Sequence, residues 1–221
     1  MNKLLITAAA VVFATSAFAT DLPNKKKAPA APAPVATPAA AASAASTDNT
    51  ISVDTGYEAA TDKYGYSDRN KNTYNVTFSH NIGGGFSLGA KAGTTQAYDQ
   101  GAIAQNIEGQ AGYALPAFAG VALSGKVGVG ERFTNGTDYA YYAAYGNADY
   151  KINDAIAINA VQYRYRSAFD DAVGYKSHQI GTGVTYSFAD KQSVYAKVYR
   201  NYDNAWTGTD NGVSIGYKLA F

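Results

Sequence analysis

The last nine residues alternate strictly between apolar and small or polar side chains, and this pattern restricts the fold more than any other feature. The apolar positions are Val213, Ile215, Tyr217, Leu219 and Phe221, and the positions between them are Ser214, Gly216, Lys218 and Ala220. Successive side chains of a strand point to opposite faces, so the segment predicts a strand with one apolar and one polar face. Its apolar face ends on an aromatic residue.

This terminal pattern resembles the closing strand of Gram-negative outer-membrane β-barrels. In that family the last strand also carries the signal read by the barrel-assembly machinery. The resemblance therefore implies an assembly role for Tyr217, Leu219 and Phe221. It also implies that the partners of the chain are this machinery together with outer-membrane lipid and lipopolysaccharide.

The first 19 residues have the order of parts of a secretory signal peptide. Lys3 precedes an apolar stretch that runs from Leu4 to Phe18, and Ala17-Phe18-Ala19 is a small-x-small cleavage site. No later segment approaches about 18 consecutive apolar residues, so no membrane-spanning helix is expected. The absence of cysteine excludes a lipoprotein anchor, a disulfide framework and thiolate chemistry.

Residues 20–50 form a Pro/Ala/Lys-rich segment, which we expect to be a disordered linker in the periplasm because it cannot bury enough apolar surface to fold. Its opening, Asp21-Leu22-Pro23 followed by lysines, alanines and prolines, is similar to the mature start of small porin-like barrels of the opacity-protein type. The triplet Lys25, Lys26 and Lys27 is a candidate contact for an anionic cell-wall polymer, although a solvated linker is the simpler explanation and the one we favour.

Composition favours strands over helices in the remainder of the chain. There are 22 glycines and 19 tyrosines against one methionine, and only 16% of residues are charged. A formal net charge of +1 gives no basic field for nucleic acid. The mean hydropathy of −0.23 fits a transmembrane barrel, which presents only alternate residues to lipid.

Residues 51–221 read as a series of alternating strands separated by turn residues. We expect strands at 51–60, 73–82, 85–96, 104–115, 120–132, 139–151, 155–166, 177–188, 192–202 and 211–221. Short and long connections alternate, as in an up-and-down antiparallel transmembrane β-barrel. Ten strands are predicted, with eight as the alternative.

Charged residues share the face of Ser, Thr and Gly, which predicts a charge network in the lumen. Its expected members are Asp54, Glu58, Lys91, Glu108, Lys126, Asp149, Lys197 and Lys218. Charges in a narrow barrel are costly unless paired. The strand positions predict four pairs: Lys91 with Glu108, Glu108 with Lys126, Lys126 with Asp149, and Lys218 with Asp54.

The strand at 155–166 breaks the pattern, because Ile156 and Ile158 share their parity with Arg164 and Arg166. Either a β-bulge reverses the face within this strand, or the two arginines lie at the outer rim.

Catalytic and metal sites are not predicted. Ser79-His80 and Ser177-His178 place their side chains on opposite faces of a strand, so neither pair can act as a dyad. His178 could meet Asp170 or Asp171 at an outer loop, which leaves a surface hydrolase as a minor alternative. Two histidines without cysteine supply no transition-metal site, and no cofactor is expected.

The sequence thus predicts an all-β chain with a signal peptide (1–19), a linker (20–50) and one outer-membrane barrel (51–221). The expected role is non-enzymatic, in envelope structure or surface interaction. A narrow porin for small solutes or ions is the first alternative and an outer-membrane surface hydrolase the second.

Overall fold

The structure is a computed structural model that describes residues 49–61, 70–97 and 103–221. The predicted signal peptide, most of the predicted linker and Lys25–Lys27 lie outside the described residues. The strands are β1 (Asn49–Ala60), β2 (Lys71–Gly83), β3 (Phe86–Ala97), β4 (Ile103–Ala114), β5 (Val121–Phe133), β6 (Tyr139–Lys151), β7 (Ile156–Ala168), β8 (Lys176–Ala189), β9 (Gln192–Asp203) and β10 (Gly208–Ala220). A 3₁₀ turn, η2 (Asp171–Val173), precedes β8.

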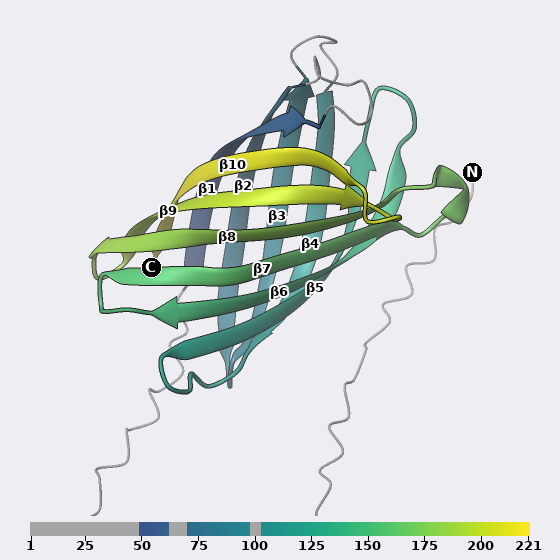
Figure 1. Cartoon of the computed structure of the whole chain (residues 1–221). Helices are drawn as coiled ribbons and strands as arrows, with labels where there is room; N and C mark the ends of the chain where they lie inside the picture. The colour runs from purple at the N-terminus through teal and green to yellow at the C-terminus, as the bar shows by residue number, and fades with distance from the viewer. Residues whose placement is uncertain (1–48, 62–69, 98–102) are drawn as a thin grey trace, which may run out of the picture. The chain divides into compact units, whose positions relative to one another are not determined.

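The ten strands form one closed barrel in which each strand pairs antiparallel with its neighbours in sequence. β1 closes the barrel against β10, with Ile51 opposite Leu219 and Val53 opposite Tyr217. Figure 1 shows β7–β10 running across the front of the barrel, with β1–β3 behind them. The predicted count of ten is confirmed, and every strand boundary lies within three residues of its expected position.

The two ends of the barrel differ in their connections. One end, called the closing end here, carries the chain ends of the barrel and the connections 84–85, 115–120, 152–155 and 190–191. There the backbones of Asn49 and Phe221 exchange two hydrogen bonds of 2.8 Å. The opposite end, called the loop end, carries the other five connections.

The β2–β3 connection shows why glycine is needed at the closing end. Gly83, Gly84 and Gly85 have φ values of 93°, 61° and 85°, a left-handed region that side chains with a Cβ rarely adopt. Three consecutive glycines therefore allow the chain to reverse within two residues.

The apolar side chains lie on the outside of the barrel. Val53, Ile107, Val129 and Ile215 are 45–64% exposed, whereas the buried hydrophobic residues among those described are only Tyr141, Ala143 and Ala168. Outward apolar and inward polar side chains are typical of a barrel that faces lipid. The described residues include no helix that is long and apolar enough to cross a membrane.

A β-bulge in β7 resolves the irregular strand. The pairing of β7 with β8 shifts between Asn159 and Gln162, so the residues on either side of the shift keep different parities. Ile158 and Val161 both face outward and are 39% and 50% exposed, while Arg166 is 5% exposed. The bulge is therefore the correct one of the two alternatives, and Arg164 and Arg166 point into the lumen.

Candidate functional site: the lumen of the barrel

Glu108, in the middle of β4, is the most completely enclosed charge of the lumen. Its side chain is fully buried, and Arg166 donates to its Oε2 at 3.1 Å from a side chain that is 6% exposed. Tyr141 donates to Oε2 at 2.8 Å, while Tyr145 and Gln110 donate to Oε1 at 2.6 and 2.7 Å. These five residues are called the Glu108 cluster below.

Glycines on β5 make the Glu108 cluster geometrically feasible. Glu108 on β4 reaches its partners on β6 and β7, so its side chain must cross β5. A Cβ added to Gly128 would lie 2.8 Å from Glu108 Oε1, and one added to Gly130 would lie 2.9 Å from the hydroxyl of Tyr141. The cluster therefore lies flat along the wall, and it does not bridge the lumen.

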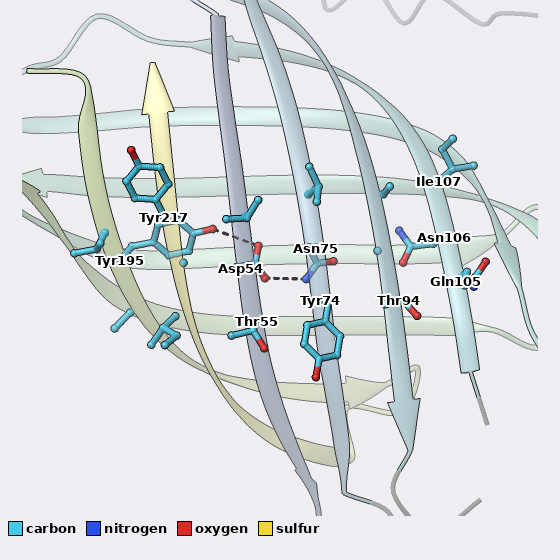
Figure 2. A pocket seen from close by; sticks show the side chains of 18 of the residues that line it. Asp54, Thr55, Tyr74, Asn75, Thr94, Gln105, Asn106, Ile107, Tyr195 and Tyr217 are labelled. Atoms are coloured by element: carbon cyan, nitrogen blue, oxygen red, sulfur yellow. Dashed lines mark hydrogen bonds between the residues drawn. The ribbon is translucent and has the colours of Figure 1, made fainter. Parts of the chain in front are cut away.

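The same arrangement occurs where the barrel closes. Asp54 and Glu58 on β1 reach across β10 to tyrosines of β9: Tyr195 donates to Asp54 Oδ2 at 3.3 Å, and Tyr199 donates to Glu58 Oε1 at 3.1 Å. Gly216 and Gly212 occupy the crossing points, and a Cβ at either would collide with the tyrosine ring. Asn75 also donates to Asp54, at 2.8 Å (Figure 2), and Asn201 donates to Glu58 at 3.2 Å. These six hydrogen-bonding residues are called the seam cluster.

The expected lysine–carboxylate pairs do not form. Lys91 lies directly opposite Glu108, as predicted, but the carboxylate turns toward Arg166 instead. Lys126 lies opposite Tyr145, whereas Glu108 lies opposite Gly130 and Asp149 opposite Ala122. Four residues of offset separate the groups by about 13 Å along the strands, so the two predicted Lys126 pairs are wrong.

Lys218 and Asp54 are also out of register. Lys218 lies opposite Ser52, two positions from the partner of Asp54, and no ion pair between the two is formed among the described residues. Lys197 places its Nζ 4.6 Å from the ring centroid of Tyr195. Asp149 accepts a hydrogen bond of 2.5 Å from Asn159. Asp54, Glu58 and Asp149 therefore accept hydrogen bonds from amides and tyrosines in place of the expected lysines.

Several residues of these clusters were missed at the sequence level. Arg166 was left ambiguous by the bulge, and Tyr141, Tyr145, Tyr195 and Tyr199 were not assigned a role. Their parity was the available signal, since each falls on the polar face of its strand together with the charges.

A cavity of about 550 Å³ occupies the lumen from the loop end to the middle of the strands. We call it the vestibule. Its lining includes seven basic residues: Lys71, Lys91, Arg132, Arg164, Arg166, Lys176 and Lys197. Four acidic residues also line it: Asp54, Glu58, Asp203 and Asp210. Lys71 pairs with Asp210 at 2.8 Å, and Lys176 pairs with Asp171 at 3.2 Å.

Tyr175, in the connection before β8, stands among three guanidinium groups at the rim of the vestibule. Arg132 lies 5.6 Å from its ring centroid, and Ser177 donates to its hydroxyl at 3.2 Å. Burial would raise the pKa of Tyr175, but the positive charges of Arg166, Arg132 and Arg164 outweigh burial and hold the pKa below its usual value. The local field at this rim is therefore positive.

A second hollow, of about 1300 Å³, lies on the outer surface across the closure of the barrel. Figure 2 shows it from close by, with Thr55, Tyr74, Thr94 and Ile107 on four adjacent strands. Its walls are mainly outward-facing apolar side chains of the kind that contact lipid. The hollow therefore belongs to the apolar outer surface of the barrel.

The residues with catalytic potential take part in other contacts. His178 stacks on Trp206 with ring centroids 4.3 Å apart and bonds to the Tyr163 hydroxyl at 2.8 Å. Asp171 pairs with Lys176, and Asp170 caps the turn η2 by accepting from Ala172 at 2.9 Å. Within the described ranges, no group of three or more His, Cys, Asp or Glu side chains could hold a metal ion.

The predicted assembly residues all lie at or near the closing end of β10. Tyr217 donates to Gln192 of β9 at 2.9 Å, Leu219 faces Ile51 of β1, and Phe221 is 54% exposed. Phe221 is thus joined to Asn49 through its backbone while its ring stays accessible.

Several solved structures are similar to this chain. An outer-membrane channel from Pseudomonas putida F1 has a TM-score of 0.50 at 12% identity, covering 80% of this chain and 96% of that one. The translocator domain of the autotransporter NalP from Neisseria meningitidis gives 0.47 at 10% identity, covering 80% and 89%. Neisserial surface protein A gives 0.40 at 11% identity, covering 78% and 97%.

These likenesses concern the fold alone, and the first of them agrees with the closed antiparallel β-barrel described above. No protein-family model matches the sequence, and no curated protein matches it.

Proposed function

We propose that this protein is a non-enzymatic outer-membrane channel, a narrow pore for the passive diffusion of small solutes. Its loop end would face outward, and the predicted linker would lie in the periplasm. The observation that carries the proposal is the direction in which the Glu108 cluster and the seam cluster extend. Because both run along the wall over glycine positions, neither crosses the lumen.

The vestibule supports the same proposal. A ten-stranded barrel lies close to the size at which side chains fill the interior. Here the bulky inward tyrosines lean against neighbouring glycines, and a cavity of about 550 Å³ extends inward to Asp54, Lys91 and Lys197. The P. putida protein of similar fold is itself a channel.

A structural role without conduction is the second candidate. The Glu108 cluster favours it, since five tightly connected residues stiffen the wall from β4 to β7. Lipid and lipopolysaccharide would then cover the outward face, and the protein would serve envelope integrity or surface interaction.

Conductance in planar lipid bilayers tests the proposal. We expect the purified full chain to give small, steady conductance steps. Thr95 lines the vestibule and Thr94, its neighbour, lines the outward hollow. Thr95→Trp should therefore reduce the step size, while the matched control Thr94→Trp should leave it unchanged.

Two results would contradict the channel. One is a barrel that is folded, as judged by its altered mobility in unboiled gel samples, but that never conducts. The other is equal conductance of the Thr95→Trp and Thr94→Trp variants.

We further propose that Phe221 is read by the barrel-assembly machinery. Deleting Phe221 should leave unfolded, protease-sensitive chain in the periplasm, because its exposed ring is available to a partner. Removal of Phe118, which is 84% exposed in the β4–β5 connection, is the control for loss of an exposed aromatic residue at the closing end. Wild-type membrane levels without Phe221 would refute this role.

A further inference from the structure

The vestibule contains positive charges that no carboxylate of the described chain neutralises. Four of its basic residues have no carboxylate oxygen within 4.0 Å among the described residues: Lys91, Arg132, Arg164 and Lys197. Two carboxylates of the lining, Asp54 and Glu58, accept hydrogen bonds from the tyrosines and amides of the seam cluster instead. Because seven basic residues face only four acidic ones in the lining, the net fixed charge of the vestibule is positive.

Arg164 is the most informative of the four. Its Nε is inaccessible to solvent and has no hydrogen-bond partner among the residues that the structure describes. Buried polar atoms are rarely left unsatisfied, and the guanidinium fork matches carboxylate and phosphate oxygens. Such a donor in the wall of a cavity indicates that an acceptor belongs beside it.

Other cations converge on the same region from separate strands. Arg132 on β5 and Arg164 and Arg166 on β7 surround Tyr175, and Lys91 on β3 lines the same cavity. Arg166 is committed to Glu108 at 3.1 Å. Arg132, Arg164 and Lys91 therefore remain as three uncommitted cations around one space.

We propose that Lys91, Arg132 and Arg164 form a binding site in the vestibule for a small organic anion that carries several carboxylate or phosphate groups. The inference rests on the proposed channel, for which it names the class of solute. A cavity of about 550 Å³ lies in the range of about 300–1,000 Å³ that small-molecule sites occupy. Three cations on three elements favour a ligand with more than one anionic group, since each group engages a different side chain.

Isothermal titration calorimetry of the full chain in detergent, at low ionic strength, tests the site. The probes are inorganic pyrophosphate and citrate, one for each chemistry. Arg164→Gln should weaken binding by about tenfold or more, because it removes the fork and its charge. Arg164→Lys should weaken it less. Arg132→Gln is a second variant from another strand.

Arg200→Gln is the matched control. Arg200 is exposed on the outer face of β9, 5.6 Å above the ring of Tyr202, so its loss removes one positive charge outside the vestibule. The control should bind both probes as tightly as the unmodified chain.

Binding of pyrophosphate alone, of citrate alone or of both supports the site and identifies the preferred group. Absence of binding for both probes, or equal weakening by Arg164→Gln and Arg200→Gln, overturns it. The outcome is separable from that of the channel: a barrel that binds anions without conducting retains the site and loses the channel, and a conducting barrel without binding does the reverse.

Discussion

The barrel stabilises its inward-facing carboxylates in two different ways on different parts of its wall. In the Glu108 cluster a fully buried carboxylate has a guanidinium partner and three further donors. In the seam cluster Asp54 and Glu58 are half-buried and have only tyrosine and amide donors. Both clusters use the same layout, in which a carboxylate reaches over a glycine to a tyrosine two strands away.

The difference shows where charge can be left unpaired. A fully buried ion needs a counter-ion, because desolvation in the wall is not recovered from neutral donors alone. A half-buried carboxylate that still meets water in the vestibule can do without one. The carboxylates of the seam cluster therefore form no ion pair with Lys91 or Lys197 among the described residues, and both lysines can interact with solutes in the lumen.

Replacing a carboxylate by its amide should give the largest difference in stability between the Glu108 cluster and the seam cluster. Glu108→Gln leaves Arg166 buried without its counter-ion, and we expect the free energy of unfolding to fall by about 3 kcal/mol. Asp54→Asn, the matched change in the seam cluster, should cost about 1 kcal/mol, the value of one hydrogen bond. Denaturant unfolding in detergent measures both. Equal losses would show that the guanidinium adds nothing to the Glu108 cluster.

Glycine replacement should have the next largest effect. Gly128→Ala places a methyl group 2.8 Å from Glu108 Oε1, and four donors prevent that carboxylate from moving away. We expect a loss of about 1–3 kcal/mol. Gly146→Ala is the control, since no atom lies within 4 Å of the added Cβ.

In the seam cluster, Gly216→Ala should cost less than Gly128→Ala. The hydrogen bond that holds Tyr195 to Asp54 is 3.3 Å long, so the ring can be displaced with little loss. If Gly216→Ala proves the more damaging, the seam cluster is the more rigid of the two and the comparison is reversed.

Removal of single tyrosine hydroxyl groups gives a finer comparison. Tyr141→Phe deletes a buried donor 2.8 Å from Glu108 and should cost about 1.5–3 kcal/mol, as for a hydrogen bond to a charged group. Tyr195→Phe deletes the longer bond to Asp54 and should cost about 0.5–1 kcal/mol. The midpoint of guanidinium unfolding reports both. A larger loss of stability for Tyr195→Phe than for Tyr141→Phe would contradict the difference between the two clusters.

The positions and faces of the strands could be predicted from the sequence alone. Strict alternation located all ten strands, because a one-residue error would move every lipid-facing side chain into the lumen. The expected lumen face of Glu108 and Lys126 followed from the same parity. The pairing of these residues did not follow from parity, because strand register depends on turn geometry at both ends. An offset of four residues separates Lys126 from both expected carboxylates.

The bulge in β7 shows the second limit of sequence reasoning. Arg166 supplies the counter-ion of Glu108 only because the register shifts between Asn159 and Gln162. Alternation indicated that this strand was irregular without fixing where its face reverses. The role of the tyrosines could not be predicted for a different reason. Each donates to a carboxylate two strands away, and this contact depends on a glycine in the strand between them.

The smallest effect on stability is expected at Lys126. This lysine lies within electrostatic range of Lys197 and Lys218 and has no ion pair among the described residues. Lys126→Ala should therefore change the free energy of unfolding by no more than about 0.5 kcal/mol. Arg200→Ala, on the outer face, controls for loss of one positive charge. A loss of several kcal/mol at Lys126 would restore the predicted salt bridges to Glu108 and Asp149.

The zero-current potential of the bilayer-embedded barrel under a potassium chloride gradient tests the central claim most directly. If the carboxylates are bound along the wall and the cations face the lumen, chloride should cross more easily than potassium, and the dilute compartment should become negative. Lys126→Ala should move this potential toward zero, and Arg200→Ala should not. A dilute compartment that becomes positive, or a folded barrel that carries no current, would contradict the account.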